Sequence, residues 1–130
     1  MANISKVKID NTSYDIKDSF ARNMGTYSSN EIAIGTDENG DTIYRKVYSG
    51  ATLPSNDVIT YNVSNLNINH VVNLYGGAIQ NGVKYRPFPF SDGNTANNIR
   101  CDVENAEIRI RTFSNWTGWT VRVVIEYVKN

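Results

Sequence analysis

Oxygen-bearing side chains occupy alternate positions in residues 36–48, TDENGDTIYRKVY. Asp37, Asn39 and Asp41 have the spacing of ligands in a calcium loop. A loop of the EF-hand type also needs a glycine at its sixth position and a glutamate at its twelfth, where this chain has threonine and tyrosine. Asn39-Gly40 between two apolar runs is instead typical of a tight β-turn. We therefore predict a turn without a metal, and we expect replacement of both aspartates by alanine to leave the melting temperature nearly unchanged.

The one histidine, His70, and the one cysteine, Cys101, are candidates for nucleophilic chemistry. Such a site needs a histidine beside the nucleophile and a carboxylate that orients it, and no motif in the sequence brings these together. Cys101 alternates with apolar residues and is predicted to be a buried small hydrophobe, whereas His70 is predicted at the surface or an interface. Glu104 and Glu107 flank a predicted hairpin turn as solvated charges; a glycosidase pair is the alternative.

Two tryptophans three positions apart lie in residues 113–121, FSNWTGWTV, the segment with the strongest features of a binding site. Trp116 and Trp119 can present an indole face, and Asn115 and Thr117 add an amide and a hydroxyl. A sugar ring needs this combination of stacking surface and hydrogen-bonding groups. We name these four residues as the candidate carbohydrate site. The alternative is that one tryptophan closes the core and the other lies in a subunit contact.

The elements that position these residues are predicted to be strands. Val, Ile, Thr and Tyr suit a pleated surface, Asn and Gly suit turns, and the helix-favouring Leu and Ala are scarce. Short alternating segments recur with turn signals between them, which predicts an all-β fold, an antiparallel β-sandwich of jelly-roll type. The strands are predicted at residues 31–36, 42–48, 58–63, 70–79, 83–88, 99–103, 107–113 and 119–129.

Alternation within these segments predicts which side chains face the core. Ile108 and Ile110 share one face, with charged residues opposite, so this strand is half-buried. The last strand is apolar on both faces, which predicts a central strand or cover by a neighbouring subunit. Two prolines in RPFPF predict a sheet edge or the end of a strand, and Gly76-Gly77 predicts a bulge or the close approach of another chain.

Residues 1–26 are predicted to be an appendage. They contain a small hairpin over residues 7–16 and one helical turn that Asp18 can cap, and a linker is predicted near residues 23–30. We therefore divide the 130 residues into an N-terminal docking segment, 1–26, and a sandwich domain, 27–130.

Composition argues against several classes of function. The formal net charge is zero, so no field attracts nucleic acid or anionic lipid. No run approaches the roughly 18 apolar residues of a membrane helix, and the N-terminus lacks the apolar core of a secretory signal. A single cysteine allows no internal disulfide. We expect no nucleic acid partner, no membrane insertion, no cofactor and no metal.

Three segments resemble tail-fibre or receptor-binding-type tail proteins of phages and prophages of Gram-positive bacteria. MANISKVKIDNTSYDIKDSFAR resembles the opening of tail and baseplate accessory proteins, and residues 27–56 resemble a module of such fibres. The third is a C-terminal pattern, W(T/S)G(W/Y)T followed by EY.K, matched by Trp116, Gly118, Trp119, Glu126, Tyr127 and Lys129.

The resemblance implies a virion protein made in the bacterial cytoplasm: a homotrimeric β-rich tip, attached to other tail or baseplate proteins by its N-terminal segment, that recognises a host cell-surface polysaccharide. It implies no catalytic residues, and we expect a protein that is not an enzyme. Two alternatives stay open: a purely structural tail or baseplate component, and a small carbohydrate-active hydrolase.

Overall fold

The computed structural model describes residues 19–130, so the predicted hairpin over residues 7–16 and Asp18 lie outside the described residues. A short helix over residues 19–24 precedes the strands. No helix in the described range is long and apolar enough to cross a membrane. The elements that follow are β1 (Ile32–Thr36), β2 (Thr42–Thr52), β3 (Val58–Asn62), η2 (Ser64–Leu66), β4 (Ile68–Gln80), β5 (Lys84–Pro87), η3 (Thr95–Asn97), β6 (Ile99–Glu104), β7 (Glu107–Thr112) and β8 (Thr120–Lys129).

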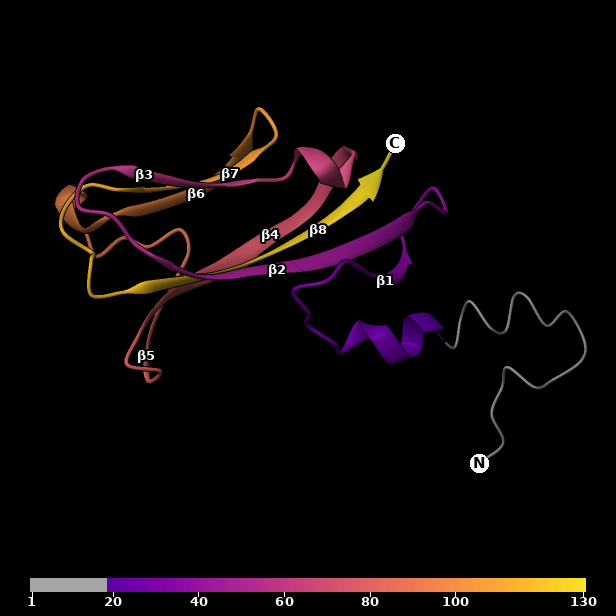
Figure 1. The fold of residues 1–130 in the computed structure, drawn as a ribbon, viewed down its shortest axis with the longest axis horizontal. Helices are drawn as coiled ribbons and strands as arrows, with labels where there is room; N and C mark the ends of the chain where they lie inside the picture. Colours follow the sequence, from indigo (N-terminus) through magenta and orange to yellow (C-terminus); the bar gives the residue numbers. More distant parts are fainter. Residues whose placement is uncertain (1–18) are drawn as a thin grey trace, which may run out of the picture.

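These strands form two antiparallel sheets that face each other, as Figure 1 shows. The larger has the order β1-β2-β8-β4-β5 and the smaller the order β3-β7-β6. The prediction of an all-β sandwich is therefore confirmed, and the jelly-roll connection pattern stays a prediction. The boundary after residue 26 also stays a prediction, because most of the N-terminal segment lies outside the described range.

Left-handed residues close two of the hairpins. Asn81 and Gly82 have φ of 53° and 70° between β4 and β5, and Asn105 and Ala106 have φ of 53° and 61° between β6 and β7. Positive φ at both central residues matches the twist of a two-residue hairpin, and this is the geometry between β6 and β7. The edge predicted from RPFPF is also confirmed, since β5 is the last strand of its sheet.

The core lies between the sheets and is built from the predicted inner faces. Ile108 and Ile110 of β7 are fully buried. They pack in one cluster with the alternate residues of β8. Those residues are Val121, Val123, Ile125 and Tyr127, none more than 1% exposed.

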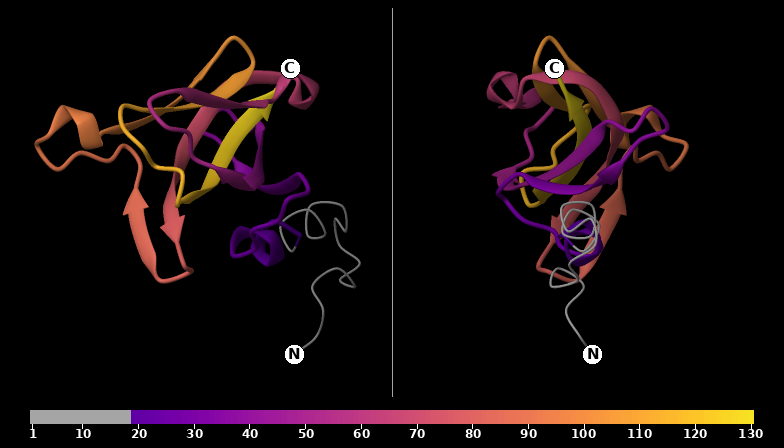
Figure 2. Two further views of the ribbon diagram at one scale, coloured as in Figure 1. Left: turned by 60° about the vertical axis from the view of Figure 1, so that its left-hand side comes forward. Right: turned by 90° about the vertical axis from the view of Figure 1, so that its right-hand side faces the viewer.

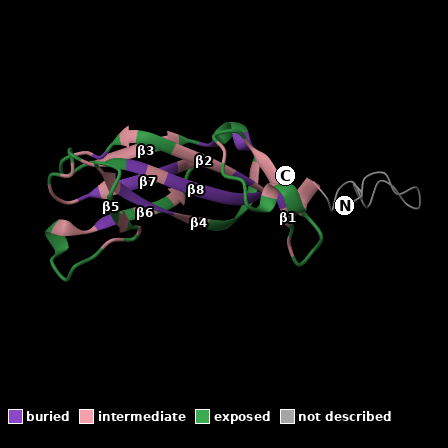
Figure 3. Ribbon diagram, turned by 90° about the horizontal axis from the view of Figure 1, so that it is seen from below, coloured by how far each residue is buried: buried purple, intermediate pink, exposed green. Residues whose placement is uncertain are grey.

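The outer face of β8 is buried as well, and Figure 3 shows this strand as buried along most of its length. Val124 and Val128 are 0% and 5% exposed. The strand lies between β2 and β4, which confirms the prediction of a central strand. The chain itself covers part of this face: the Tyr27 ring lies 4.3 Å from the guanidinium carbon of Arg45 on β2 and 5.4 Å from that of Arg122 on β8.

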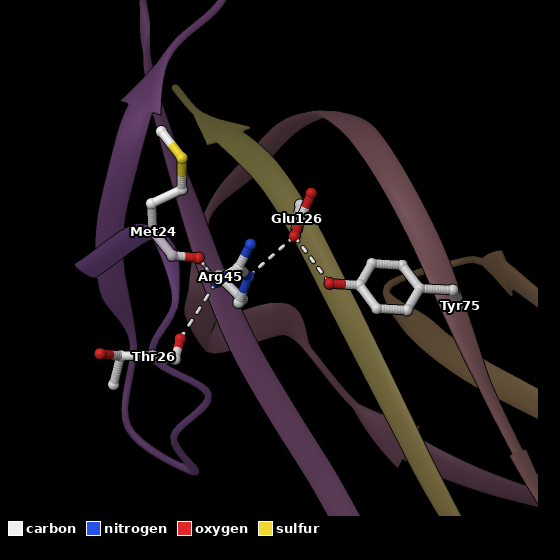
Figure 4. A network of polar contacts seen from close by, with 5 residues as sticks. All are labelled: Met24, Thr26, Arg45, Tyr75 and Glu126. Carbon is white, nitrogen blue, oxygen red and sulfur yellow. Dashed lines mark hydrogen bonds and ion pairs between the residues drawn. The ribbon is translucent and has the colours of Figure 1, made fainter. Parts of the chain in front are cut away.

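A buried ion pair connects this cover to the sheet (Figure 4). Arg45 is 6% exposed and Glu126 9%, and Arg45 Nε donates to Glu126 Oε2 over 2.8 Å. The Tyr75 hydroxyl donates to the same oxygen over 2.9 Å. Arg45 Nη1 donates to the carbonyls of Met24 and Thr26 over 2.7 and 3.1 Å. Both charges are therefore hydrogen-bonded, as burial of an ion pair requires.

The network also fixes protonation states. Burial acts to lower the pKa of Arg45, but the hydrogen bond and the negative charge of Glu126 outweigh it, so this pKa is raised. Burial raises the pKa of Tyr75, and its hydrogen bonds with Tyr27 and Glu126 raise that pKa further. Arg45 is thus held charged and the Tyr75 hydroxyl is held as a donor.

The bulge predicted at Gly76-Gly77 is wrong. The register of β4 against β8 shifts earlier, within residues 68–73, and runs regularly past both glycines. The glycines instead allow neighbouring strands of the same chain to approach closely. A Cβ on Gly76 would lie 2.1 Å from the carbonyl oxygen of Arg122, and one on Gly77 would lie 2.6 Å from that of Arg86.

We expect Glu126→Ala to destabilise the fold by about 3–5 kcal/mol, because it leaves the buried Arg45 charge without its partner. Tyr75→Phe should cost less, about 1–2 kcal/mol, since it removes the hydrogen bonds of one hydroxyl with Glu126 and Tyr27 and leaves the ion pair intact. Urea unfolding of the two variants and the parent protein measures both values. A loss below about 1 kcal/mol for Glu126→Ala would contradict a structural role for the pair.

Candidate functional site

A recess of about 300 Å³ lies at one end of the sandwich, where the β5–β6 and β7–β8 connections meet. The views in Figures 1 and 2 place this end away from the C-terminus. We call it the aromatic recess. Its lining residues are Arg86, Phe90, Asp92, Asn97, Ser114, Asn115, Trp116 and Trp119.

The structure brings together three of the four predicted carbohydrate-site residues. Asn115, Trp116 and Trp119 line the aromatic recess, whereas Thr117 does not. Thr117 is exposed, and its hydroxyl donates to Asn115 Oδ1 over 2.7 Å. Thr117 thus supports the position of the Asn115 amide.

The aromatic rings form a chain of edge-to-face contacts. Ring centroids are 5.6 Å apart for Phe90 and Trp116 and 5.2 Å for Trp116 and Trp119. The Arg86 guanidinium carbon lies 5.4 Å from the Trp119 ring centroid and 5.8 Å from that of Phe90. Because such contacts prefer defined geometry, the rings hold one another in fixed orientation.

The tryptophans serve both the fold and the recess. Both are half-buried and pack against the core cluster, so the core alternative is correct in part. The indole nitrogen of Trp116 is buried without a hydrogen-bond partner among the described residues, so this ring offers the recess apolar surface. Trp119 is the ring that the Arg86 guanidinium covers.

Backbone hydrogen bonds hold the loop that carries the tryptophans. The Trp116 amide donates to the carbonyl of Pro54 over 3.3 Å, and the Trp119 amide donates to the carbonyl of Trp116 over 2.9 Å. The Leu53 amide donates to the carbonyl of Trp119 over 2.9 Å. The loop is therefore bonded to the end of β2 on one side and begins β8 on the other.

Asp92 places a carboxylate at the rim of the aromatic recess. Its side chain accepts from the Asn94 amide over 3.0 Å and from Asn97 Nδ2 over 2.8 Å. These bonds, the backbone one first, lower the pKa of Asp92, so the group is an acceptor at neutral pH. The recess thus offers aromatic surface, a carboxylate, amides and a guanidinium.

Sequence reasoning missed five lining residues: Arg86, Phe90, Asp92, Asn97 and Ser114. The RPFPF segment predicts only a sheet edge or the end of a strand, and Asp92 and Asn97 lie in the connection that follows it. The sequence signal for the first four residues is weak, because it consists only of aromatic and amide residues near each other in one connection between strands. Only the pairing of strands places them beside residues 114–119.

The acidic segment that begins at Asp37 is a turn. Gly40 has φ of 80°, and Asp37 Oδ1 accepts from the amides of Asn39 and Asp41, each over 2.9 Å. The other oxygen of Asp37 lies 3.6 Å from Nε2 of His70 on β4. Within residues 19–130, no three His, Cys, Asp or Glu side chains gather as a metal site would require.

The remaining chemical candidates lie apart. His70 belongs to the larger sheet, beside the β1–β2 turn, and Cys101 belongs to β6 of the smaller. Cys101 packs against the core but is half-buried and not fully buried as predicted, and burial raises the pKa of its thiol to about 12. Glu104 lies at the β6–β7 turn, 3.0 Å from Arg109 Nη1.

The geometry changes what we expect of the acidic turn. Asp37→Ala should destabilise the fold by about 1 kcal/mol, because it removes two acceptor bonds from the turn. Asp41→Ala is the matched control. It should change stability little, because Asp41 forms hydrogen bonds in the turn through its backbone alone. Thermal unfolding with and without calcium measures both effects. A calcium-dependent rise in the parent's melting temperature would contradict the assignment as a turn.

Comparisons of the chain with protein-family models, with curated proteins and with solved structures find no significant match.

Proposed function

We propose that the protein is a non-enzymatic carbohydrate-binding protein that recognises a host cell-surface glycan through the aromatic recess. The observation that carries this proposal is that half-buried Trp116 and Trp119 line a recess of about 300 Å³ together with amide, hydroxyl, carboxylate and guanidinium groups. This volume lies at the lower end of the range for small-molecule sites, which suits one or two sugar rings.

The chemistry of the recess suits an uncharged, hydroxyl-rich ligand. Sugar C–H groups pack on aromatic faces, while hydroxyls pair with amide and carboxylate groups. Asn115 offers its amide N–H donors, because its Oδ1 already accepts from the amide and the hydroxyl of Thr117. Asn97 offers its Oδ1 and one N–H, and Asp92 is an acceptor. Asp92 is the one acidic residue that lines the recess, whereas glycosidases use two carboxylates, which supports binding over hydrolysis.

The setting we propose is the tail of a phage or prophage, as part of a fibre tip or baseplate. This part of the proposal rests on the sequence resemblance of residues 1–22, 27–56 and the C-terminal pattern. The arrangement suits such a setting: the aromatic recess lies far from the end of the sandwich that carries the C-terminus, and the helix over residues 19–24 lies toward that end (Figure 1). The recess can thus face outward while the N-terminal segment docks.

We further propose a homotrimer. Residues 68–75 of β4 pair with β8 on one side, whereas β5 pairs with β4 only over residues 77–80. Val71 and Val72 in this open stretch are 37% and 43% exposed. An open strand edge with exposed valines is a surface that natural proteins usually cover. Three copies would also raise the avidity of weak glycan sites.

A purely structural tail component is the second candidate. The packing of both tryptophans against the core cluster favours it, because their burial has a role without any ligand.

We expect Trp119→Ala and Arg86→Ala to weaken glycan binding roughly tenfold or more, because the first removes aromatic surface from the recess and the second removes its guanidinium donors. Binding is measured on an array of neutral oligosaccharides and on purified cell-wall polysaccharide of Gram-positive bacteria. Tyr85→Ala is the matched control, since Tyr85 is a 50% exposed aromatic residue outside the recess.

The melting temperature and mass of each variant separate the two candidates. Unchanged binding by Trp119→Ala and Arg86→Ala would refute recognition at the recess. Loss of assembly in Trp119→Ala would instead favour the structural component.

We expect light scattering to give a mass about three times the 14.6 kDa of the chain. Val72→Lys should lower that mass, because a lysine at an open edge opposes strand pairing. Val83→Lys is the control, since Val83 is 85% exposed in the β4–β5 turn. A monomeric parent protein would contradict the trimer.

A further inference from the structure

Charges are sorted along the outer face of the smaller sheet. Strands β6 and β7 pair in register, so side chains directly opposite each other share a face. Acidic residues occupy the turn end and basic residues the far end. From the turn outward, the facing pairs are Glu104 with Glu107, Asp102 with Arg109, and Arg100 with Arg111.

The middle arginine of this face, Arg109, forms ion pairs with the two nearest carboxylates. Arg109 Nε lies 3.4 Å from Asp102 Oδ1, and Arg109 Nη1 lies 3.0 Å from Glu104 Oε2. Arg109 is thus paired twice, which leaves the outer two arginines without these partners.

Arg100 and Arg111 face each other as like charges. Their guanidinium carbons lie 5.0 and 5.1 Å from the centroid of the same Phe113 ring. Among residues 19–130 neither has a carboxylate within ion-pair distance, and the polar contact of Arg111 is a 3.4 Å bond to Asn56 Oδ1. Like charges directly opposite in a sheet destabilise it, so this end of the face is suited to a negative partner.

A recess of about 350 Å³ lies at these side chains. Its lining residues are Val58, Arg100, Asp102, Arg109, Arg111 and Phe113. We call it the arginine recess. It shares no lining residue with the aromatic recess, although Ser114 and Asn115 of that recess directly follow Phe113.

We propose that the arginine recess binds an oxyanion group, a phosphate ester or a carboxylate, through Arg100 and Arg111. Each guanidinium has a planar fork of donors that matches two oxygens of such a group. Phe113 stacks against both guanidiniums and so orients them before the ligand arrives. Val58 supplies apolar contact for the carbon atoms attached to the anion.

The surrounding charges favour a single anionic group over a long polyanion. Asp102, Glu104 and Glu107 continue along the same face and would repel successive phosphates. The formal net charge of zero likewise provides no general attraction to nucleic acid. This inference does not depend on the proposed function, because the two recesses use different residues.

The test follows the arginine side-chain Nε–H signals by NMR during titration with glycerol 3-phosphate and, separately, with glucuronate. Glycerol and glucose are the neutral controls. We expect saturable shifts of the Arg100 and Arg111 signals with an oxyanion and none with the neutral compounds. The tighter of the two titrations identifies phosphate ester or carboxylate as the preferred group.

Variants assign the effect. Arg100→Gln with Arg111→Gln should weaken binding about tenfold or more, because both charge-assisted contacts are lost. Lys84→Gln, which removes a positive charge outside the recess, should bind as the parent does. If the double variant does not fold, the single variant Arg100→Gln replaces it, because Arg100 is exposed. This variant should also weaken oxyanion binding, by a smaller factor.

Three outcomes would overturn the proposal. The first is no saturable shift with either oxyanion, and the second is equal affinity in the parent and the double variant. The third is tighter binding of a single-stranded oligonucleotide than of glycerol 3-phosphate and glucuronate, lost in the same double variant, which would assign the recess to nucleic acid.

Discussion

The burial of both faces of β8 is the constraint on which the rest of the structure depends. Its inner face builds the core between the sheets, while its outer face carries the Glu126 carboxylate into a buried position. That charge is tolerated because Arg45 and Tyr75, from the two neighbouring strands, both donate to it. Arg45 then donates to backbone carbonyls that precede β1, so the same pair holds the cover of the sheet in place.

The positions of both recesses follow from this frame. The central strand begins at Thr120, directly after the tryptophan loop. Leu53 and Pro54, which follow β2, form the backbone hydrogen bonds that hold this loop. The register of β6 and β7 fixes which arginines face each other. The aromatic recess thus depends on loops held between rigid strands, and the arginine recess on the outer face of one sheet. Placing binding groups on rigid elements limits the entropy lost when a ligand binds.

Much of the fold could be predicted from the sequence, because period-two alternation and turn residues are local signals. The inner faces of β7 and β8 and the turn after Asp37 follow from such signals. The Arg45–Glu126 pair could not be predicted, since its partners are 81 residues apart and either alone looks like a surface charge. Gly76 and Gly77 were misjudged for a related reason: their role is set by strands distant in sequence.

The candidate site was predictable only in part. Two tryptophans with polar neighbours form a local pattern, and three of the four predicted residues line one recess. Arg86 and Asp92 reach the recess through strand pairing, which no local pattern specifies. The bonds from Arg45 to the carbonyls of Met24 and Thr26, and from the Val47 amide to the carbonyl of Ser28, have a mechanical consequence. Tension on the chain ahead of residue 23 would be carried by these contacts together with the bond from Asn23 Nδ2 to the carbonyl of Ala33, and would pass into β1, β2 and β8. Strands β2 and β8, which support the aromatic recess, would therefore also bear such a load.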